Sequence, residues 1–300
     1  MSNGSTGSLT QDVVNNLDTP VDIRARSFPD NNHAEESSKN KPIVSKKSMT
    51  SLNILSAVEL DGQTEEDLWA TWNVLLQNWD TLKRKARSGL EPLVRKGIPI
   101  HLRPVVWKNL VQTDTKILTQ SYPSLINSET PFEKQIIRDS TRTFPTHEMF
   151  QSPDSDGVES LRNLMHAYAV YDKEVGYCQG LGFVAGLLLM IMPEEEAFCV
   201  FIQILQENRI RDMYKPSMSL LSICNHQLDK LIEETHPHVY YHLKHQGFSC
   251  SLYASTWFLT LFSTMLPLDT VFRIMDIYLI EGLNIIFQRW KVFSISSLMI

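Results

Sequence analysis

The chain has 300 residues, of which 43% are hydrophobic and 21% are charged, within the ordinary range of soluble globular proteins. The net charge is -6, and the first fifty residues balance six acids with six bases, so the acidic excess lies in residues 51–300 and argues against nucleic acid as the main partner. The four cysteines, Cys178, Cys199, Cys224 and Cys250, form no CxxC pair and indicate free thiols of a reducing compartment.

Residues 1–55 form the first segment of the chain. They are rich in Ser, Asn, Asp and Lys, poor in aromatic residues, and without a sustained hydrophobic period. Such a composition buries too little apolar surface to offset the entropy lost on ordering, so we predict a disordered tail. Residues 1–16 have neither a basic leader nor an apolar run long enough for a secretion signal. We therefore expect a cytoplasmic protein.

An amphipathic helix is predicted within residues 60–90. Thr64 precedes three acidic residues, which is typical of a capped helix N-terminus. Apolar residues then recur at helical spacing from Leu68 to Leu82, three of them tryptophans, and basic residues gather before Gly89, which is expected to end the helix. We expect this helix to pack on the domain that follows, which we place at residues 95–300.

Two further helices are marked by their ends. Thr130-Pro131-x-Glu133 matches a capping box with proline at the first helical position, and that helix must end before Pro145. Arg142 is therefore expected at or just past the C-terminal end of the helix. A third helix is predicted from about residue 158 to Tyr171, because its apolar residues lie on one stripe.

Two uncharged stretches, residues 175–192 and 248–268, are candidates for membrane spans. The first holds about a dozen apolar residues before Pro193, where a span needs roughly twenty. The second carries seven Ser or Thr residues, so both are predicted to be buried inside the protein. Apolar helices are also expected after Pro193, Pro216, Pro237 and Pro267, and hardly any segment alternates with period two. The predicted fold class is all-α.

Two short patterns offer side chains that GTP hydrolysis needs. Ile136-x-x-Asp139-x-x-Arg142-Thr143-Phe144-Pro145 supplies an arginine, and Gly176-Tyr177-Cys178-Gln179-Gly180 supplies a glutamine. An arginine stabilises charge that develops on a transferring phosphate, and a glutamine orients the attacking water. Alone, Arg142 and Asp139 read as an ordinary surface pair, and Gln179 is still less specific.

The order of the motifs makes the interpretation specific. Arg103-x-x-x-Trp107-x-x-Leu110, followed by the two patterns above, resembles the three signature motifs of the TBC domain, the family of GTPase-activating proteins for Rab GTPases. The resemblance extends from about residue 97 to residue 287. Within the family, residues 193–198 and 253–267 look most like the ecotropic viral integration site branch.

The resemblance implies a multi-helical TBC-like domain that docks on a Rab-family small GTPase. Arg142 would then be an arginine finger and Gln179 a glutamine finger, both inserted in trans, so the chain would be an activator and not itself the hydrolase. Asp139, Tyr177 and Gly180 are supporting candidates, Asp139 as a holder of the arginine. The chain would need no cofactor of its own, because GTP and Mg²⁺ belong to the Rab.

By the same resemblance, the expected process is vesicle trafficking, with peripheral association to endomembranes through the Rab. Arg103 and Trp107 lie on one helix face and are expected to shape the scaffold. Which Rab, which membrane and which oligomeric state apply does not follow from the sequence.

Three alternatives accompany this interpretation. A non-catalytic Rab-binding scaffold stays open because the pattern departs from the family after Phe287, which suggests a domain truncated at its C-terminus that would expose Leu279, Leu283 and Ile286. A zinc site is suggested by His238, His242 and His245, whose spacing also suits a plain polar helix face. A dinucleotide site at Gly180-x-Gly182-x-x-x-Gly186 has the wrong spacing and no preceding strand, so close backbone packing is the preferred interpretation.

Overall fold

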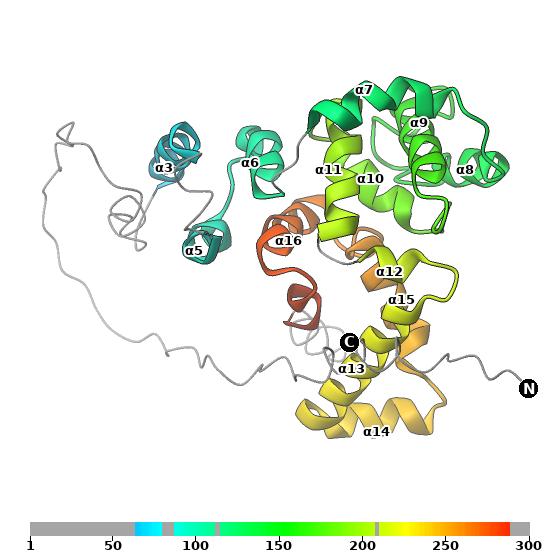
Figure 1. Cartoon of the computed structure of the whole chain (residues 1–300). Helices are drawn as coiled ribbons and strands as arrows, with labels where there is room; N and C mark the ends of the chain where they lie inside the picture. The colour runs from blue at the N-terminus through cyan, green and yellow to red at the C-terminus, as the bar shows by residue number, and fades with distance from the viewer. Residues whose placement is uncertain (1–63, 80–86, 112–114, 208–209, 289–300) are drawn as a thin grey trace, which may run out of the picture. The chain divides into compact units, whose positions relative to one another are not determined.

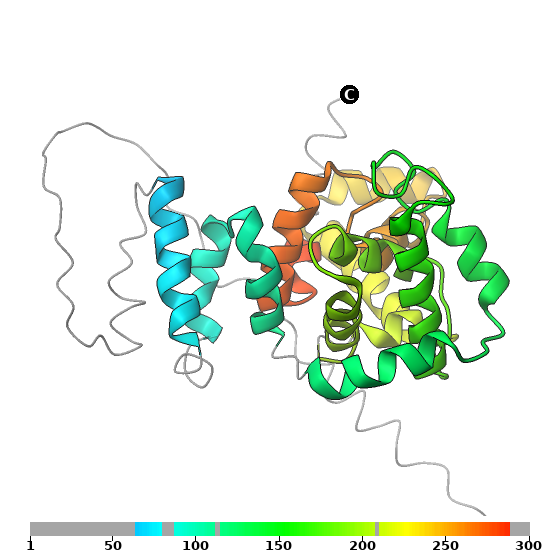
Figure 2. The same cartoon turned by 90° about the horizontal axis from the view of Figure 1, so that it is seen from above.

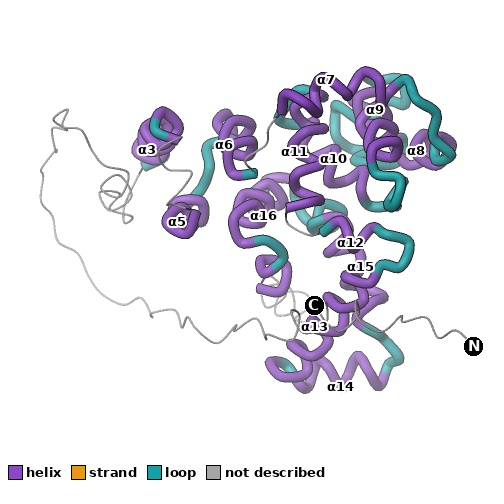
Figure 3. Tube along the Cα trace, in the orientation of Figure 1, coloured by secondary structure: helices purple, strands orange, loops and turns teal. Residues whose placement is uncertain are grey.

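The structure is a computed structural model, and it describes residues 64–79, 87–111, 115–207 and 210–288. These residues form helices joined by loops, without a strand among them, which confirms the all-α prediction (Figures 1 and 3). The helices up to the first long loop are α3 (Glu65–Gln77), α5 (Arg87–Lys96), the short 3-10 helix η1 (Ile100–Leu102), α6 (Arg103–Leu110), α7 (Thr115–Ile126) and α8 (Glu133–Ser140). The remaining helices are α9 (Asp156–Tyr171), α10 (Leu181–Leu189), α11 (Glu194–Glu207), α12 (Arg211–Tyr214), α13 (Ser219–Thr235), α14 (Pro237–His245), α15 (Cys250–Thr260) and α16 (Leu268–Glu281).

Helix α10 lies at the centre of the hydrophobic core. It carries no charged or polar side chain, and of its residues only Phe183 is more than slightly exposed. Helices α9, α11 and α15 all pack against it. Because α10 is buried inside this group of helices, the apolar part of the uncharged stretch is core, as predicted, while Gln179 before it is exposed. No described helix is both long enough and apolar enough to span a membrane.

The N-terminal helices attach to α16. Both α5 and α6 pack against α16, and the two views show them side by side (Figures 1 and 2). Trp72 of α3 donates its indole N–H to the carbonyl oxygen of Gly97 across 2.7 Å. Trp72 is fully buried, whereas Trp69 is half exposed, so the expected stripe of tryptophans covers the core only in part.

Two helix ends differ from the sequence predictions. Helix α3 has the predicted cap, with the Thr64 hydroxyl accepting from the Asp67 amide, but it ends at Gln77. Gly89 was expected to end this helix and lies instead inside α5. The Thr130 capping box does not form, and α8 begins at Glu133, because the Glu133 carboxylate bonds the ring of His166 on α9 rather than the helix N-terminus.

The predicted disordered tail, residues 1–55, lies outside the described residues. At the other end, the expectation that Leu279, Leu283 and Ile286 are exposed is wrong for Leu279 and Ile286, which are fully buried, while Leu283 is half-buried. Helix α16 packs against α5 and α6 and is buried on nearly every side, so Leu279 joins the hydrophobic core.

Candidate functional site

Arg142 lies just past the C-terminal end of α8, as predicted. The helix ends at Ser140, and the Arg142 amide closes a last turn onto the carbonyl oxygen of Asp139 at 3.2 Å. The Arg142 side chain is half exposed, and its Nη2 lies 2.9 Å from Oδ1 of Asp139. The guanidinium is therefore held at one end while its remaining donors stay open to solvent or a partner.

Asp139 is the polar centre of this segment. It is 5% exposed, and it also accepts from Arg138 Nε at 3.2 Å and from the Tyr177 hydroxyl at 2.9 Å. Burial, and then the bond to Asp139, raises the pKa of Tyr177 well above its usual value, so the hydroxyl stays protonated and donates. Tyr177 thus ties the glutamine motif to the arginine motif.

Gln179 is exposed on the loop between α9 and α10. Two glycines with left-handed backbone shape this loop, Gly176 at φ +59° and Gly180 at φ +111°. Gly180 is also the N-cap of α10, and a Cβ there would lie 3.2 Å from the Leu259 carbonyl oxygen of α15. The loop therefore needs glycine at Gly180 both for its backbone angle and for its close approach to α15.

The start of this loop is fixed by Asp172 at the end of α9. Its carboxylate accepts two bonds from Arg211 on α12 and one from the Val175 amide at 3.3 Å. Burial raises the pKa of Asp172, but these hydrogen bonds and one from Tyr168 outweigh it, and the pKa falls below its ordinary value. The ionised carboxylate therefore contributes to holding the glutamine loop.

Arg142 and Gln179 line one cleft, whose volume is about 540 Å³. Its lining comes mainly from the segment around Arg142, from the loop and first turn at the start of α10, and from α15 with the turn that follows it. The lining residues are Asp139, Arg142, Thr143, Tyr177, Cys178, Gln179, Gly180, Gly182, Phe183, Met218, Thr256, Leu259, Thr260 and Thr264. The cleft thus offers one cation, one carboxamide and several hydroxyls, donors suited to phosphate oxygens.

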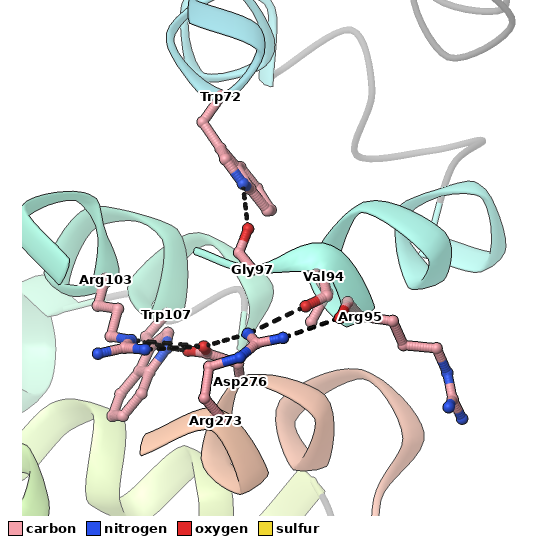
Figure 4. Close-up of polar contacts among 8 residues, drawn as sticks. All are labelled: Trp72, Val94, Arg95, Gly97, Arg103, Trp107, Arg273 and Asp276. Carbon is pink, nitrogen blue, oxygen red and sulfur yellow. Dashed lines mark hydrogen bonds and ion pairs between the residues drawn. The ribbon is translucent and has the colours of Figure 1, made fainter. Parts of the chain in front are cut away.

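Arg103 and Trp107 lie in a different place, in a buried cluster around Asp276 (Figure 4). Arg103 Nε approaches Asp276 Oδ1 at 3.2 Å, Trp107 Nε1 donates to the same oxygen at 2.8 Å, and Arg273 Nη1 donates to Oδ2 at 2.8 Å. Arg273 also donates to the carbonyl oxygens of Val94 and Arg95 at the end of α5. The cluster therefore joins α5, α6 and α16.

A sequence model of the Rab-GTPase-TBC domain matches residues 100–297. The chain belongs to this family. The match holds all three motifs and every residue of the cleft, so the site just described lies within the TBC domain.

Curated relatives agree with the family. The chain is 45% identical over 224 residues to the human ecotropic viral integration site 5 protein homolog, covering 75% of this chain and 28% of that protein. It is 41% identical over 271 residues to the Rab GTPase-activating protein eat-17 of Caenorhabditis elegans, covering 89% of this chain and 30% of that protein. The resemblance to the ecotropic viral integration site branch is thus confirmed. The chain spans less than a third of the length of these relatives.

Solved structures support the fold. The crystal structure of the Chlamydomonas flagellar RabGAP TBC domain aligns with a TM-score of 0.66 and 27% identity, covering 85% of this chain and 87% of that one. The Ypt/Rab-GAP domain of Gyp1p aligns with a TM-score of 0.58 and 20% identity, over 71% and 81% of the two chains, and shows the fold alone.

Sequence reasoning missed the α15 wall of the TBC cleft. Thr256 and Thr260 lie one turn apart on α15, Thr264 lies in the turn after that helix, and all three line the cleft. The Ser and Thr content of this stretch argued only against a membrane span. The spacing of four between Thr256 and Thr260 was a usable signal, since it places both hydroxyls on one helix face.

The histidine helix does not form a metal site with its neighbours. His238, His242 and His245 lie on α14, exposed. Among the described residues, no group of three or more His, Cys, Asp or Glu side chains is arranged to hold a metal ion.

Proposed function

We propose that this chain is a GTPase-activating protein for a Rab-family small GTPase. The observation that carries the proposal is the placement of Arg142 and Gln179, 37 positions apart in the sequence, on the walls of one cleft. The family match and the printed name of the relative eat-17 support the partner class.

Arg142 acts as the arginine finger. Its guanidinium is planar, permanently charged and forked, so it matches two phosphate oxygens at once as lysine does not. Its resting contact with Asp139 is a single ion pair on a half-exposed side chain, and such a pair is worth about 0–1 kcal/mol. The phosphate of a bound nucleotide therefore competes readily for the guanidinium.

Gln179 acts as the glutamine finger. A carboxamide accepts a hydrogen bond from the attacking water and donates one to a phosphate oxygen, so it fixes the water in line without being consumed. Its exposed position on a glycine-bounded loop allows a visiting protein to reach it. GTP and Mg²⁺ are brought by the Rab, and the chain needs no cofactor of its own.

The physiological consequence is the inactivation of a Rab on the membrane it occupies. The chain then joins the endomembrane peripherally, through its partner, and regulates vesicle trafficking.

The test is single-turnover GTP hydrolysis by a panel of purified Rab proteins with and without this chain. Wild type accelerates at least one Rab, and Arg142→Ala removes about 10³- to 10⁵-fold of rate, equivalent to about 4–7 kcal/mol of barrier. Arg142→Lys stays inactive because it lacks the fork, and Gln179→Ala is strongly impaired.

The chain offers matched controls for both substitutions. Arg138→Ala removes a neighbouring, more exposed arginine that contacts the same Asp139, and Gln246→Ala removes an exposed glutamine after α14; both keep near wild-type activity. If wild type binds a Rab but leaves its hydrolysis rate unchanged, the chain is a non-catalytic scaffold and the proposal is wrong.

A further inference from the structure

Phe144, two residues after Arg142, has an unusual backbone. Its φ is +51°, and the side chain is 7% exposed. A bulky residue with left-handed backbone is a conformational outlier, and such outliers persist only where surrounding contacts enforce them. The contacts of Phe144 therefore determine how the chain leaves Arg142.

The ring of Phe144 is seated on helix α10. It packs edge-on against Phe183 with ring centroids 5.2 Å apart, and it lies 6.0 Å from the ring of Phe150. A Cβ on Gly186 would lie 2.9 Å from Cε2 and 3.0 Å from Cδ2 of Phe144, closer than carbon atoms pack. Gly186 is thus the seat on which the ring rests, and the space exists only because the residue is glycine.

Thr143 makes a similar contact one helical turn earlier. Its hydroxyl donates to the Asp139 carbonyl oxygen at 2.8 Å, and a Cβ on Gly182 would lie 3.3 Å from that hydroxyl oxygen. Both residues that follow Arg142 therefore lie directly against α10. This same helix begins at Leu181, two residues after Gln179. The arginine segment therefore rests on the helix that directly follows the loop carrying Gln179.

We propose that Phe144, seated on Gly186, is a positioning residue that sets where Arg142 projects relative to Gln179. The proposal rests on the proposed function, since it states how the two fingers of that same cleft are held in register. Phe144 does not touch the partner or the nucleotide. It acts through the backbone of residues 142–144.

Gly186→Ala tests the proposal because the only close contact of the added methyl group is the Phe144 ring. Gly186 lies inside α10, where alanine favours the helix more than glycine does. The added methyl group meets the Phe144 ring and displaces it together with the Arg142 backbone. A misplacement of about 1 Å costs about 10²-fold in rate, so kcat for the stimulated hydrolysis falls by about that factor. KM for the Rab is expected to change little, because both residues are buried.

Phe144→Leu supplies the rescue. Leucine is shorter than phenylalanine, so Gly186→Ala/Phe144→Leu again has room at the seat and recovers most of the lost kcat. Phe144→Leu alone leaves the seat loosely filled, folds, and lowers kcat with KM unchanged. Leu75→Val, which trims the buried core of α3, is the control for a loss of packing that has no connection to the cleft.

Hydrogen exchange measured by mass spectrometry gives a readout that does not require an active Rab pair. The amides of Arg142 and Thr143 bond the carbonyl oxygens of Asp139 and Ser140. Gly186→Ala speeds exchange in the peptide that spans these two amides, the double variant slows it again, and Leu75→Val leaves it unchanged. If wild type stimulates no Rab, the proposed function fails. The exchange pattern still tests whether the packing of Phe144 on Gly186 holds the backbone of Arg142.

Three results would overturn the proposal. The first is unchanged kcat and unchanged exchange in Gly186→Ala. The second is a loss of kcat that only follows the unfolded fraction, as in Leu75→Val. The third is a double variant no better than Gly186→Ala. If Gly186→Ala does not fold, Phe144→Leu alone decides, and wild-type kcat and exchange in that variant overturn the proposal.

Discussion

Tyr177 donates its hydroxyl to Asp139 across 2.9 Å, and this bond joins two motifs that lie 38 positions apart in the sequence. Tyr177 stands two residues before Gln179, and Asp139 stands three residues before Arg142. The other carboxylate oxygen of Asp139 contacts Arg142. The buried carboxylate of Asp139 therefore links the loop that carries Gln179 with the side chain of Arg142.

Tyr177→Phe tests the value of this bond for the fold. The change leaves Oδ2 of a buried carboxylate without its hydroxyl donor, which costs about 1–3 kcal/mol in the free energy of unfolding. Urea denaturation measures the loss, and the stimulated hydrolysis rate falls by at most about tenfold, far less than in Arg142→Ala. Tyr241→Phe, on an exposed tyrosine of α14, is the control and leaves both quantities near wild type.

Asp139→Asn tests the holding of Arg142. Asparagine still accepts from Tyr177 through its carbonyl oxygen, but it no longer attracts the guanidinium. Because the ion pair of Asp139 with Arg142 is worth about 0–1 kcal/mol, its loss lowers kcat by at most about fivefold. Single-turnover kinetics at saturating Rab measures this. A rate equal to wild type would show that the partner alone orients Arg142.

The sequence predicts most helices because each one carries its own signal. Prolines 193, 216 and 267 precede helices α11, α13 and α16, Pro237 is the first residue of α14, and the apolar stripe up to Tyr171 marks α9. Arg142 falls just after α8 because Pro145 limits that helix. These predictions depend on local physics, namely periodicity and backbone restriction.

The features that sequence reasoning missed depend on partners distant in the chain. The Glu133 carboxylate bonds His166 on α9 rather than capping its own helix. Asp276 binds Arg103, which lies 173 positions away in the sequence. The threonine wall of the cleft belongs to the site only because α15 packs against α10. The motifs identify the proposed fingers, but tertiary packing decides which residues surround them.

Asp276→Ala tests the buried cluster. Asp276 is fully buried, and burial raises its pKa, while two arginines and Trp107 surround it. Removing the carboxylate leaves these guanidinium groups without their counter-charge in the interior, and breaking such a buried pair costs about 3–5 kcal/mol. Chemical denaturation measures the loss. Asp269→Ala, on the exposed first turn of the same helix, is the control with a small effect.

Asp172→Asn tests whether the Asp172 carboxylate anchors the loop that carries Gln179. The test is the pH dependence of the free energy of unfolding. The folded-state pKa of Asp172 lies below its ordinary value of 3.8, because the bonds from Arg211, Val175 and Tyr168 outweigh the effect of burial. A group with a lowered folded pKa contributes stability that is complete above the unfolded pKa and is lost as the pH falls through the folded pKa. At pH 7 the variant is therefore less stable by about 1.5–3 kcal/mol, the value of hydrogen bonds to a charged group.

The same difference in unfolding free energy shrinks as the pH drops below about 4, because wild-type Asp172 becomes protonated and loses its advantage over asparagine. Urea denaturation of both proteins between pH 7 and pH 3 measures it, and the other acids largely cancel in the comparison. Glu174→Gln is the matched control, since Glu174 bonds the same Arg211 from an exposed position and contributes much less. A difference between Asp172→Asn and wild type that stays constant down to pH 3 would mean that the carboxylate charge does not hold the loop.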